Sequence, residues 1–327
     1  MVAPSTAIIR YELSAPFTEF DLMMNRKRYI APQVLRPRIV SVQAANVGKI
    51  KLKELLQQHD TLHAGGAGYK RGNFTFDKYS YATEEHGWEE PMTDRDLALY
   101  RDLIDAEDIH SQRAMSTVCD HYERDVAAAI YDTAVWSTAA LKTAVSVSWN
   151  TPATADPIGD IIAAREKIVT GSGLEPNALI MNRLQFDHLK NTEQIVDRVK
   201  YTSEANQEKM AAAVAECLGV KHLLVAGGLT NTANSQQTAA ISRIWSNDKA
   251  MLARVAETDD PKEPCIGRTF IWNEEGTGSI GDGEELAVIV EEYREENVRG
   301  SVMRARNDRD IQIMYKEAGH LLTGVLT

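Results

Sequence analysis

The 327-residue chain has few cysteines and no long apolar run, and it has no excess of positive charge. Cys119, Cys217 and Cys265 are too few and too scattered for a disulfide framework, and no CxxC pair indicates a zinc site. No stretch approaches the ~18 consecutive apolar residues of a membrane-spanning helix. The N-terminus lacks the basic start and apolar core of a signal peptide. We therefore expect reduced thiols, no membrane partner and folding in a cytoplasm.

The balance of charge is acidic. Lys and Arg number 36 against 47 Asp and Glu, which gives a net charge of -11 and a pI near 5.3. Affinity for nucleic-acid phosphates depends on Lys and Arg, so this composition argues against direct DNA binding. A hydrophobic content of 43% is enough to bury one large core or two moderate ones.

Two histidines form the first candidate metal site. His59 and His63 are four residues apart, and on a helix they could share a zinc ion, with Asp60 beside them. Gly65 and Gly66 follow at once and would end such a helix, and no third ligand follows at a known spacing. The sequence therefore favours exposed histidines near a loop tip over a metal site.

Three glycine-containing or acidic segments could suggest other sites. Residues 65–70 resemble a phosphate-binding loop, but Arg71 replaces the required Ser or Thr and a strand is expected next. Residues 226–231 lack GxGxxG, so we interpret them as a turn. Residues 273–285 are acidic but lack the alternation of an EF-hand. We expect no catalytic, cofactor-binding or metal-binding residue, and hence no enzyme.

The N-terminal third predicts an extended organisation. Four prolines interrupt residues 1–47, which indicates an arm that needs another surface to order it. Residues 49–81 predict a long hairpin, because Ile50 and Leu52 alternate with lysines and Phe74 and Phe76 alternate with polar residues. The hairpin tip is rich in glycine and therefore flexible. We expect it to contact another subunit through Gly65, Gly66, Gly68, Tyr69, Lys70 and Arg71.

The centre of the chain predicts a long helix and a small α/β unit. Thr93 is a good N-cap, and apolar residues keep helical spacing from Leu97 to Ile130, which predicts one helix over 93–132. Residues 157–226 then predict a helix capped by Asp156 and stopped by glycines, a strand at 178–181, three short helices and a strand at 222–226. Later runs predict a hairpin of 240–245 with 250–255, and strands at 286–293, 301–306 and 310–315.

Five phrases, in this order, resemble the major capsid proteins of tailed bacteriophages, whose fold is also found in encapsulin nanocompartments. They are RYIAPQVLRPRIVSV (28–42), YSYATEEHGWEEPMTDRD (79–96), VSVSWNTPATADPIGDIIAAREKI (145–168), SGLEPNALIMNRLQFDHLKNTEQIVDRVKY (172–201) and LGVKHLLVAGGLTNTA (218–233). The resemblance covers nearly the whole chain, and its specificity comes from the order and spacing of the phrases.

The resemblance implies an α+β fold with four parts. Residues 1–47 would be the N-terminal arm and 48–92 the extended loop. Residues 93–156 with 287–327 would form a peripheral domain that contains the spine helix, and 157–286 would form an α/β axial domain. It also implies self-assembly into pentamers and hexamers, in an icosahedral shell that encloses double-stranded DNA without reading its sequence. Scaffolding, portal and cement proteins are the implied partners, and the implied location is the virion, after assembly in the host bacterial cytoplasm.

Two other functions fit some of the same features. An encapsulin-type shell would have a similar fold and assembly, but would hold a cargo protein instead of nucleic acid. A soluble metal-dependent hydrolase would use His59, His63 and the acidic loop, and would form a small oligomer. The predicted long helix and uncovered hairpin have no purpose in the hydrolase.

Overall fold

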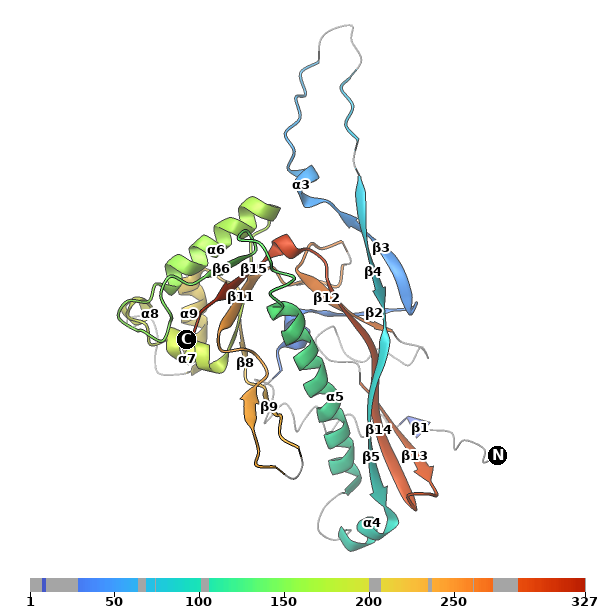
Figure 1. Ribbon diagram of the computed structural model, residues 1–327. Helices are drawn as coiled ribbons and strands as arrows, with labels where there is room; N and C mark the ends of the chain where they lie inside the picture. The colour runs from blue at the N-terminus through green and yellow to red at the C-terminus, as the bar shows by residue number, and fades with distance from the viewer. Residues whose placement is uncertain are drawn as a thin grey trace.

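The computed structural model describes residues 8–9, 29–63, 69–73, 75–100, 106–199, 207–234, 237–260, 262–272 and 288–326. Figure 1 shows an α/β unit on one side, a long twisted sheet on the other, and a long helix between them. A β-ribbon projects beyond both. Within the described residues, no helix is both long and apolar enough to cross a membrane.

The long sheet is built around one strand, β14 (Gly300–Ile313). Its neighbours follow the order β1 (Ile8–Ile9), β13 (Ile289–Glu295), β14, β12 (Gly267–Trp272) and β2 (Pro37–Val40), with β5 (Glu84–Thr93) on the other edge of β14. The sequence predicted two strands, at 301–306 and 310–315, where the structure has one. The reason is that β5 pairs with β14 from Gly300 to Arg309, across the expected break.

The predicted helix over 93–132 is two helices, α4 (Asp94–Tyr100) and α5 (Ala106–Tyr131). Thr93 caps the first as expected, because its Oγ1 accepts the Asp96 N–H at 3.1 Å. The correction follows from the path of the chain. β5 leads directly into α4, and α5 then runs back over β5 and β14 (Figure 1). A single straight helix would continue away from that sheet.

Apolar side chains on one face of α5 hold it in place. Its buried residues recur at helical spacing and include Ala114, Met115, Val118, Tyr122, Val126 and Ile130. The first of these pack with Met303 and Ala305 of β14, and the later ones pack with the α/β unit. Helix α5 therefore joins the two halves of the molecule, which is the role expected of a spine.

The second sheet has the order β6 (Lys142–Ala144), β15 (Gly319–Thr323), β11 (Lys249–Ala253), β7 (Ala178–Asn182) and β8 (His222–Ala226). All five residues of β7 are buried, because both faces of the sheet are covered. Ile180 packs in the cluster that contains α5 residues. Leu179 packs with residues of α6 (Pro157–Ser172), α7 (Arg183–Leu189), α8 (Glu193–Val199) and α9 (Gln207–Leu218).

The local signals that predict the elements of this unit agree with the structure. Asp156 caps α6 by accepting the Gly159 N–H at 2.8 Å, and Pro157 begins the helix. Gly173 ends it with a φ of 73°, a left-handed conformation that favours glycine. The predicted strands and short helices between 178 and 226 are present as β7, α7, α8, α9 and β8.

The predicted hairpin of 240–245 with 250–255 is wrong. Strand β10 (Ile241–Arg243) pairs with β9 (Leu229–Asn231), and β11 pairs with β7 and β15. The segment between β10 and β11 is held from elsewhere. Asn182 Nδ2 donates to the carbonyl oxygens of Trp245 and Ser246 at 3.1 and 3.0 Å. These long-range contacts, which the local pattern does not contain, redirect the chain.

The projecting ribbon consists of β3 (Ala44–Ile50) and β4 (Phe76–Ala82), with the short helix α3 (Leu52–Leu55) after β3. The register runs from Ala44 opposite Ala82 to Ile50 opposite Phe76, so a hairpin is present, but its first strand lies earlier than predicted and Leu52, expected in that strand, begins α3. Two remaining short helices are α2 (Ala31–Val34), before β2, and the 3-10 turn η1 (Lys316–Ala318), before β15.

The two sheets cross the predicted domain boundaries at two places. Strand β12 lies within 157–286 but pairs with β14, and β15 lies within 287–327 but pairs with β11. The chain therefore passes between the two halves several times, and the four-part division stays a prediction.

Candidate assembly surfaces

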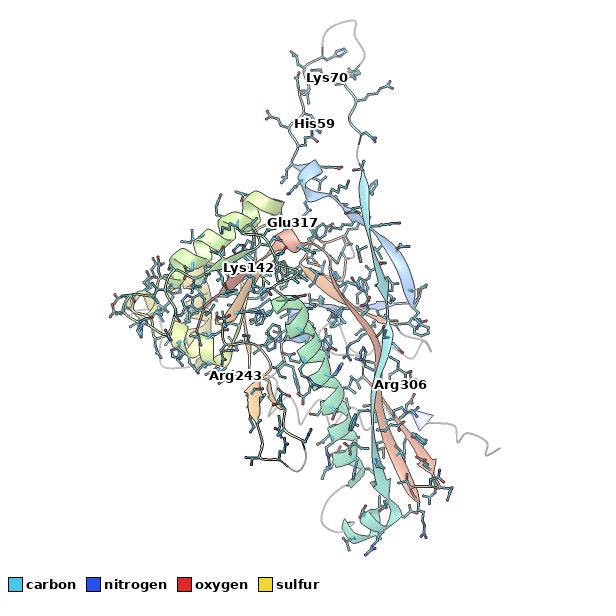
Figure 2. The ribbon with its side chains drawn as sticks, viewed as in Figure 1. His59, Lys70, Lys142, Arg243, Arg306 and Glu317 are labelled. Carbon is cyan, nitrogen blue, oxygen red and sulfur yellow. The ribbon has the colours of Figure 1, made fainter. Side chains whose placement is uncertain are left out.

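The extended loop exposes large apolar side chains. Leu55 and Leu56 are 61% and 62% exposed, Leu62 and Tyr69 are each 79% exposed, and Phe76 is 71% exposed. Figure 2 shows that His59 and Lys70 lie far out along this loop, away from both sheets. Exposed apolar surface on a projecting element is typical of an interaction surface, because its contact with water is unfavourable and a partner that covers it lowers the free energy.

The predicted contact residues lie at the end of this loop. Tyr69, Lys70 and Arg71 are exposed. Lys70 forms an ion pair with Asp60, and the Tyr69 ring stacks on His63 with centroids 4.4 Å apart. Gly65, Gly66 and Gly68 lie outside the described residues. The contact that we predicted for these six residues needs a neighbouring subunit and stays a prediction.

The base of the loop is anchored firmly to the long sheet. The Tyr81 ring stacks on Phe270 of β12 with centroids 4.6 Å apart. Asp310 accepts the Ala82 N–H at 2.9 Å, and Tyr315 donates its hydroxyl to the Ile50 carbonyl at 3.0 Å. A fixed base with an exposed outer part holds the loop ready for a partner.

A buried carboxylate fixes the chain where the arm leaves the core. Glu123 of α5 has no exposed surface, and it accepts the Ala31 N–H at 2.9 Å and the Trp245 indole N–H at 2.6 Å. The Ile30 N–H donates to both of its oxygens, at 3.1 and 3.2 Å. Burial raises the pKa of Glu123 to about 7, and these hydrogen bonds act in the opposite direction.

The His59–His63 pair does not form the metal site that the sequence offered as an alternative. Residues 57–63 are not helical, so the four-residue spacing does not bring the two rings to one helix face. Both histidines are exposed, and Asp60 is already paired with Lys70. The phosphate-loop alternative also lacks its helix, since residues 69–73 are not helical.

One cluster that the sequence analysis missed has metal-ligating side chains. His86 of β5 and His121 and Asp125 of α5 each place one potential ligand atom within 4.8 Å of the others. Arg309 of β14 already supplies the cation: its Nη2 lies 2.7 Å from Asp125 Oδ2 and 2.8 Å from His121 Nδ1. We therefore interpret the cluster as the binding site of a buried arginine. His121 and Asp125 are four residues apart on α5, but His86 and Arg309 come from other elements, so no local spacing reveals the whole cluster.

Of the two remaining candidate segments, the structure describes 226–231 but not 273–285. Residues 226–231 pass from β8 to β9, and the strand that follows confirms the turn and excludes the helix of a dinucleotide-binding motif. The acidic segment 273–285 lies outside the described residues. The thiols of Cys119 and Cys265 are buried.

No protein-family model and no curated protein sequence matches this chain. Solved structures do match. A phage-related protein from Bordetella bronchiseptica aligns at a TM-score of 0.70 and 20% identity, over 98% of each chain. The virus-like particle from Pyrococcus furiosus aligns at 0.55 and 13% identity, over 95% of this chain and 98% of that one. The capsid of cyanophage P-SCSP1u aligns at 0.54 and 12% identity, over 91% and 88%.

These likenesses define the class of fold. The chain has the α+β fold of tailed-phage capsid proteins, which the Pyrococcus particle shares. The expectation from the five sequence phrases is confirmed at this level.

Proposed function

We propose that the chain is a major capsid protein, the subunit that assembles into the icosahedral shell of a tailed phage. The observation that carries the proposal is the extended loop, with its anchored base and its exposed Leu55, Leu62, Tyr69 and Phe76. A two-stranded ribbon is marginal in isolation, and a neighbouring subunit is the surface that would cover it. The likeness to capsid structures supports the same role.

The proposed assembly has pentamers and hexamers that enclose double-stranded DNA. In the predicted arm (1–47), the part before residue 30 would lie along one neighbour, and in the predicted extended loop (48–92), the projecting part would lie over another, because residues 30–40 and 84–92 pack or pair within the subunit. The peripheral domain (93–156 and 287–327) and the axial domain (157–286) would form the wall. Scaffolding, portal and cement proteins are the proposed partners, and the virion, built in the host cytoplasm, is the proposed location. The role is structural and includes no chemical step.

The experiment that tests the proposal is negative-stain electron microscopy of the purified chain after size exclusion. Closed shells, tubes or capsomer rings are the expected result, since the subunit carries its own contact surfaces. A small, stable oligomer that persists when a scaffold is supplied, and that holds stoichiometric metal, would overturn it in favour of the hydrolase alternative.

An encapsulin-type shell is the second candidate function, because a virus-like particle aligns about as well as the cyanophage capsid, and a shell with this fold need not enclose a genome. The contents of the particles distinguish the two. Particles purified from the native host should protect double-stranded DNA from nuclease if the chain is a phage coat. A protected protein and no DNA would favour the encapsulin.

A further inference from the structure

Charged and titratable side chains from three elements meet where α5 lies over β5 and β14 (Figure 1). His86 comes from β5, His121 and Asp125 come from α5, and Arg309 comes from β14. Arg309 Nη2 lies 2.8 Å from His121 Nδ1 and 2.7 Å from Asp125 Oδ2. Arg309 Nη1 donates to Asn307 Oδ1 on its own strand at 2.8 Å. One buried guanidinium therefore holds α5 to the sheet at this point.

The contact between Arg309 and His121 requires a neutral imidazole. An arginine side chain only donates hydrogen bonds and keeps its charge, so His121 Nδ1 must accept, and the ring proton must lie on Nε2. A proton added at Nδ1 would instead be available to Asp125 Oδ2, which lies 2.9 Å away. Asp125 would then be shared between two cations, and Arg309 would lose one of its acceptors.

His86 places a second titratable ring against the same guanidinium. Its ring centroid lies 5.3 Å from that of His121. A charge on His86 would interact with groups from all three elements: His121 and Asp125 of α5, Arg309 of β14, and Glu84 of its own strand. Burial lowers the pKa of His86, and the positive charge of Arg309 lowers it further. His86 is half-buried and His121 is exposed, so protons from solvent reach both rings.

We propose that this cluster is a proton-sensitive latch between α5 and the sheet, closed while both histidines are neutral and weakened when His86 gains a proton. The imidazolium adds a cation beside a buried arginine and competes with it for Asp125, so the contact that holds Arg309 weakens. Helix α5 joins the two halves of the molecule, and a weaker latch loosens that joint on the side of the long sheet. The latch lies within one subunit, so the inference does not depend on the proposed shell function.

Hydrogen exchange of the α5 amides in the full chain tests the latch. It is measured at about pH 7.5 and about pH 5.5, with rates corrected for the pH dependence of exchange itself. Because the folded-state pKa of His86 is lowered, the folded protein binds fewer protons than the unfolded one just below pH 6.5, so stability is lost as pH falls through this window. Protection of residues 114–125 should fall about threefold or more in the unchanged protein. His86→Gln, which does not titrate, should keep most of that protection.

The matched control is His59→Gln, at an exposed histidine far out on the extended loop, which should show the same fall as the unchanged protein. Arg309→Met is a second variant: with the buried cation gone, the fall should shrink as it does in His86→Gln. Glu123, on another face of α5, titrates in the same range, but it is present in every variant and cancels in the comparison. An equal fall in the unchanged protein, His86→Gln and Arg309→Met would overturn the latch, and so would protection that rises on acidification.

Discussion

Glu123 is the residue at which three parts of the molecule meet. It lies on α5, receives backbone N–H groups where the arm leaves the core, and receives the indole N–H of Trp245 from the segment before β11. Taking one carboxylate out of water costs several kcal/mol unless it is hydrogen-bonded, and here three donors supply the compensation. The contribution of Glu123 to the free energy of unfolding therefore depends on whether its carboxyl group is protonated.

We predict that Glu123→Gln changes how stability depends on pH. The folded-state pKa of about 7 lies above the ordinary value of 4.5, so the folded protein binds more protons than the unfolded one between these values. Glu123 therefore lowers the free energy of unfolding as pH rises through this window. Burial lowers the pKa of His320 to about 4, which acts in the opposite direction up to pH 6.5.

The measurement must therefore compare the variant with the unchanged protein. We expect urea unfolding at several pH values from 4.5 to 7 to show one trend. As pH rises, the free energy of unfolding of Glu123→Gln should increase relative to that of the unchanged protein. Glu166→Gln, at an exposed position on α6, is the control and should follow the unchanged protein. A difference between Glu123→Gln and the unchanged protein that does not vary with pH would contradict the prediction.

Arg309 gives a second residue-scale prediction. Its side chain is 1% exposed, whereas that of its partner Asp125 is 33% exposed. Asp125→Ala leaves a buried charge with reduced compensation and should destabilise the fold by about 3 kcal/mol. Arg309→Met leaves a carboxylate that water still reaches, and should cost about 1 kcal/mol.

A double-mutant cycle measured by urea unfolding checks this asymmetry. The Asp125→Ala/Arg309→Met variant should recover most of the loss caused by Asp125→Ala alone, because the buried charge is gone. Equal costs for the two single variants, or full additivity in the double variant, would show that the ion pair is no more than a surface contact.

Neither residue could have been identified from the sequence. Glu123 meets Ile30 and Trp245, which lie 93 and 122 residues away, and Arg309 meets Asp125 across 184 residues. Spacing along the chain points instead to His59 and His63, which have no helix to bring them together. Clusters formed by tertiary packing leave no local pattern to read.

At the scale of elements, local chemistry predicted more. The start and the end of α6 are set by local contacts of Asp156, Pro157 and Gly173. Alternation of apolar and polar residues along 49–81 predicted the ribbon. The errors arose where another element decides the outcome. Strand β5 fuses two expected strands into β14, and Asn182 holds the turn that separates β10 from β11.

The extended loop is the element whose removal separates folding from assembly. We predict that replacing residues 57–73 by an Asn-Gly turn changes Tm by no more than about 2 °C, because the described side chains of this segment are exposed in the single subunit. Shell formation should be lost, because the outer part of the loop would no longer reach a neighbour. Differential scanning calorimetry and electron microscopy measure the two effects.

A variant with the loop at its full length distinguishes the effect of loop length from the effect of its apolar side chains. Leu62→Ser/Tyr69→Ser keeps the loop but removes the two most exposed large apolar side chains among its described residues. It should weaken assembly less than the shortened loop does. Normal shells from the shortened chain would show that the loop is not an assembly element in this protein.

At the scale of the whole molecule, net charge opposes association. Each subunit carries -11, and shell closure brings many such subunits together. The segment 49–78 differs, with six Lys or Arg against three Asp or Glu, and could attract an acidic neighbour. Two of its bases are already engaged within the subunit: Lys51 with Glu54 at 3.4 Å, and Lys70 with Asp60. Repulsion between subunits should therefore outweigh attraction by the loop.

We predict that salt promotes assembly. The Debye length falls from about 10 Å at 0.1 M to about 3 Å at 1 M, so salt screens repulsion between acidic subunits, while burial of apolar loop residues is not weakened. Light scattering at a fixed protein concentration should rise from 0.05 to 0.5 M sodium chloride. A fall in scattering would mean that the basic loop segment holds neighbouring subunits mainly by charge. In that case, Lys53→Gln and Lys78→Gln would weaken assembly at low salt because each removes an attractive contact with a neighbour. If repulsion between subunits dominates, the two changes affect assembly only by making the net charge of the subunit more negative.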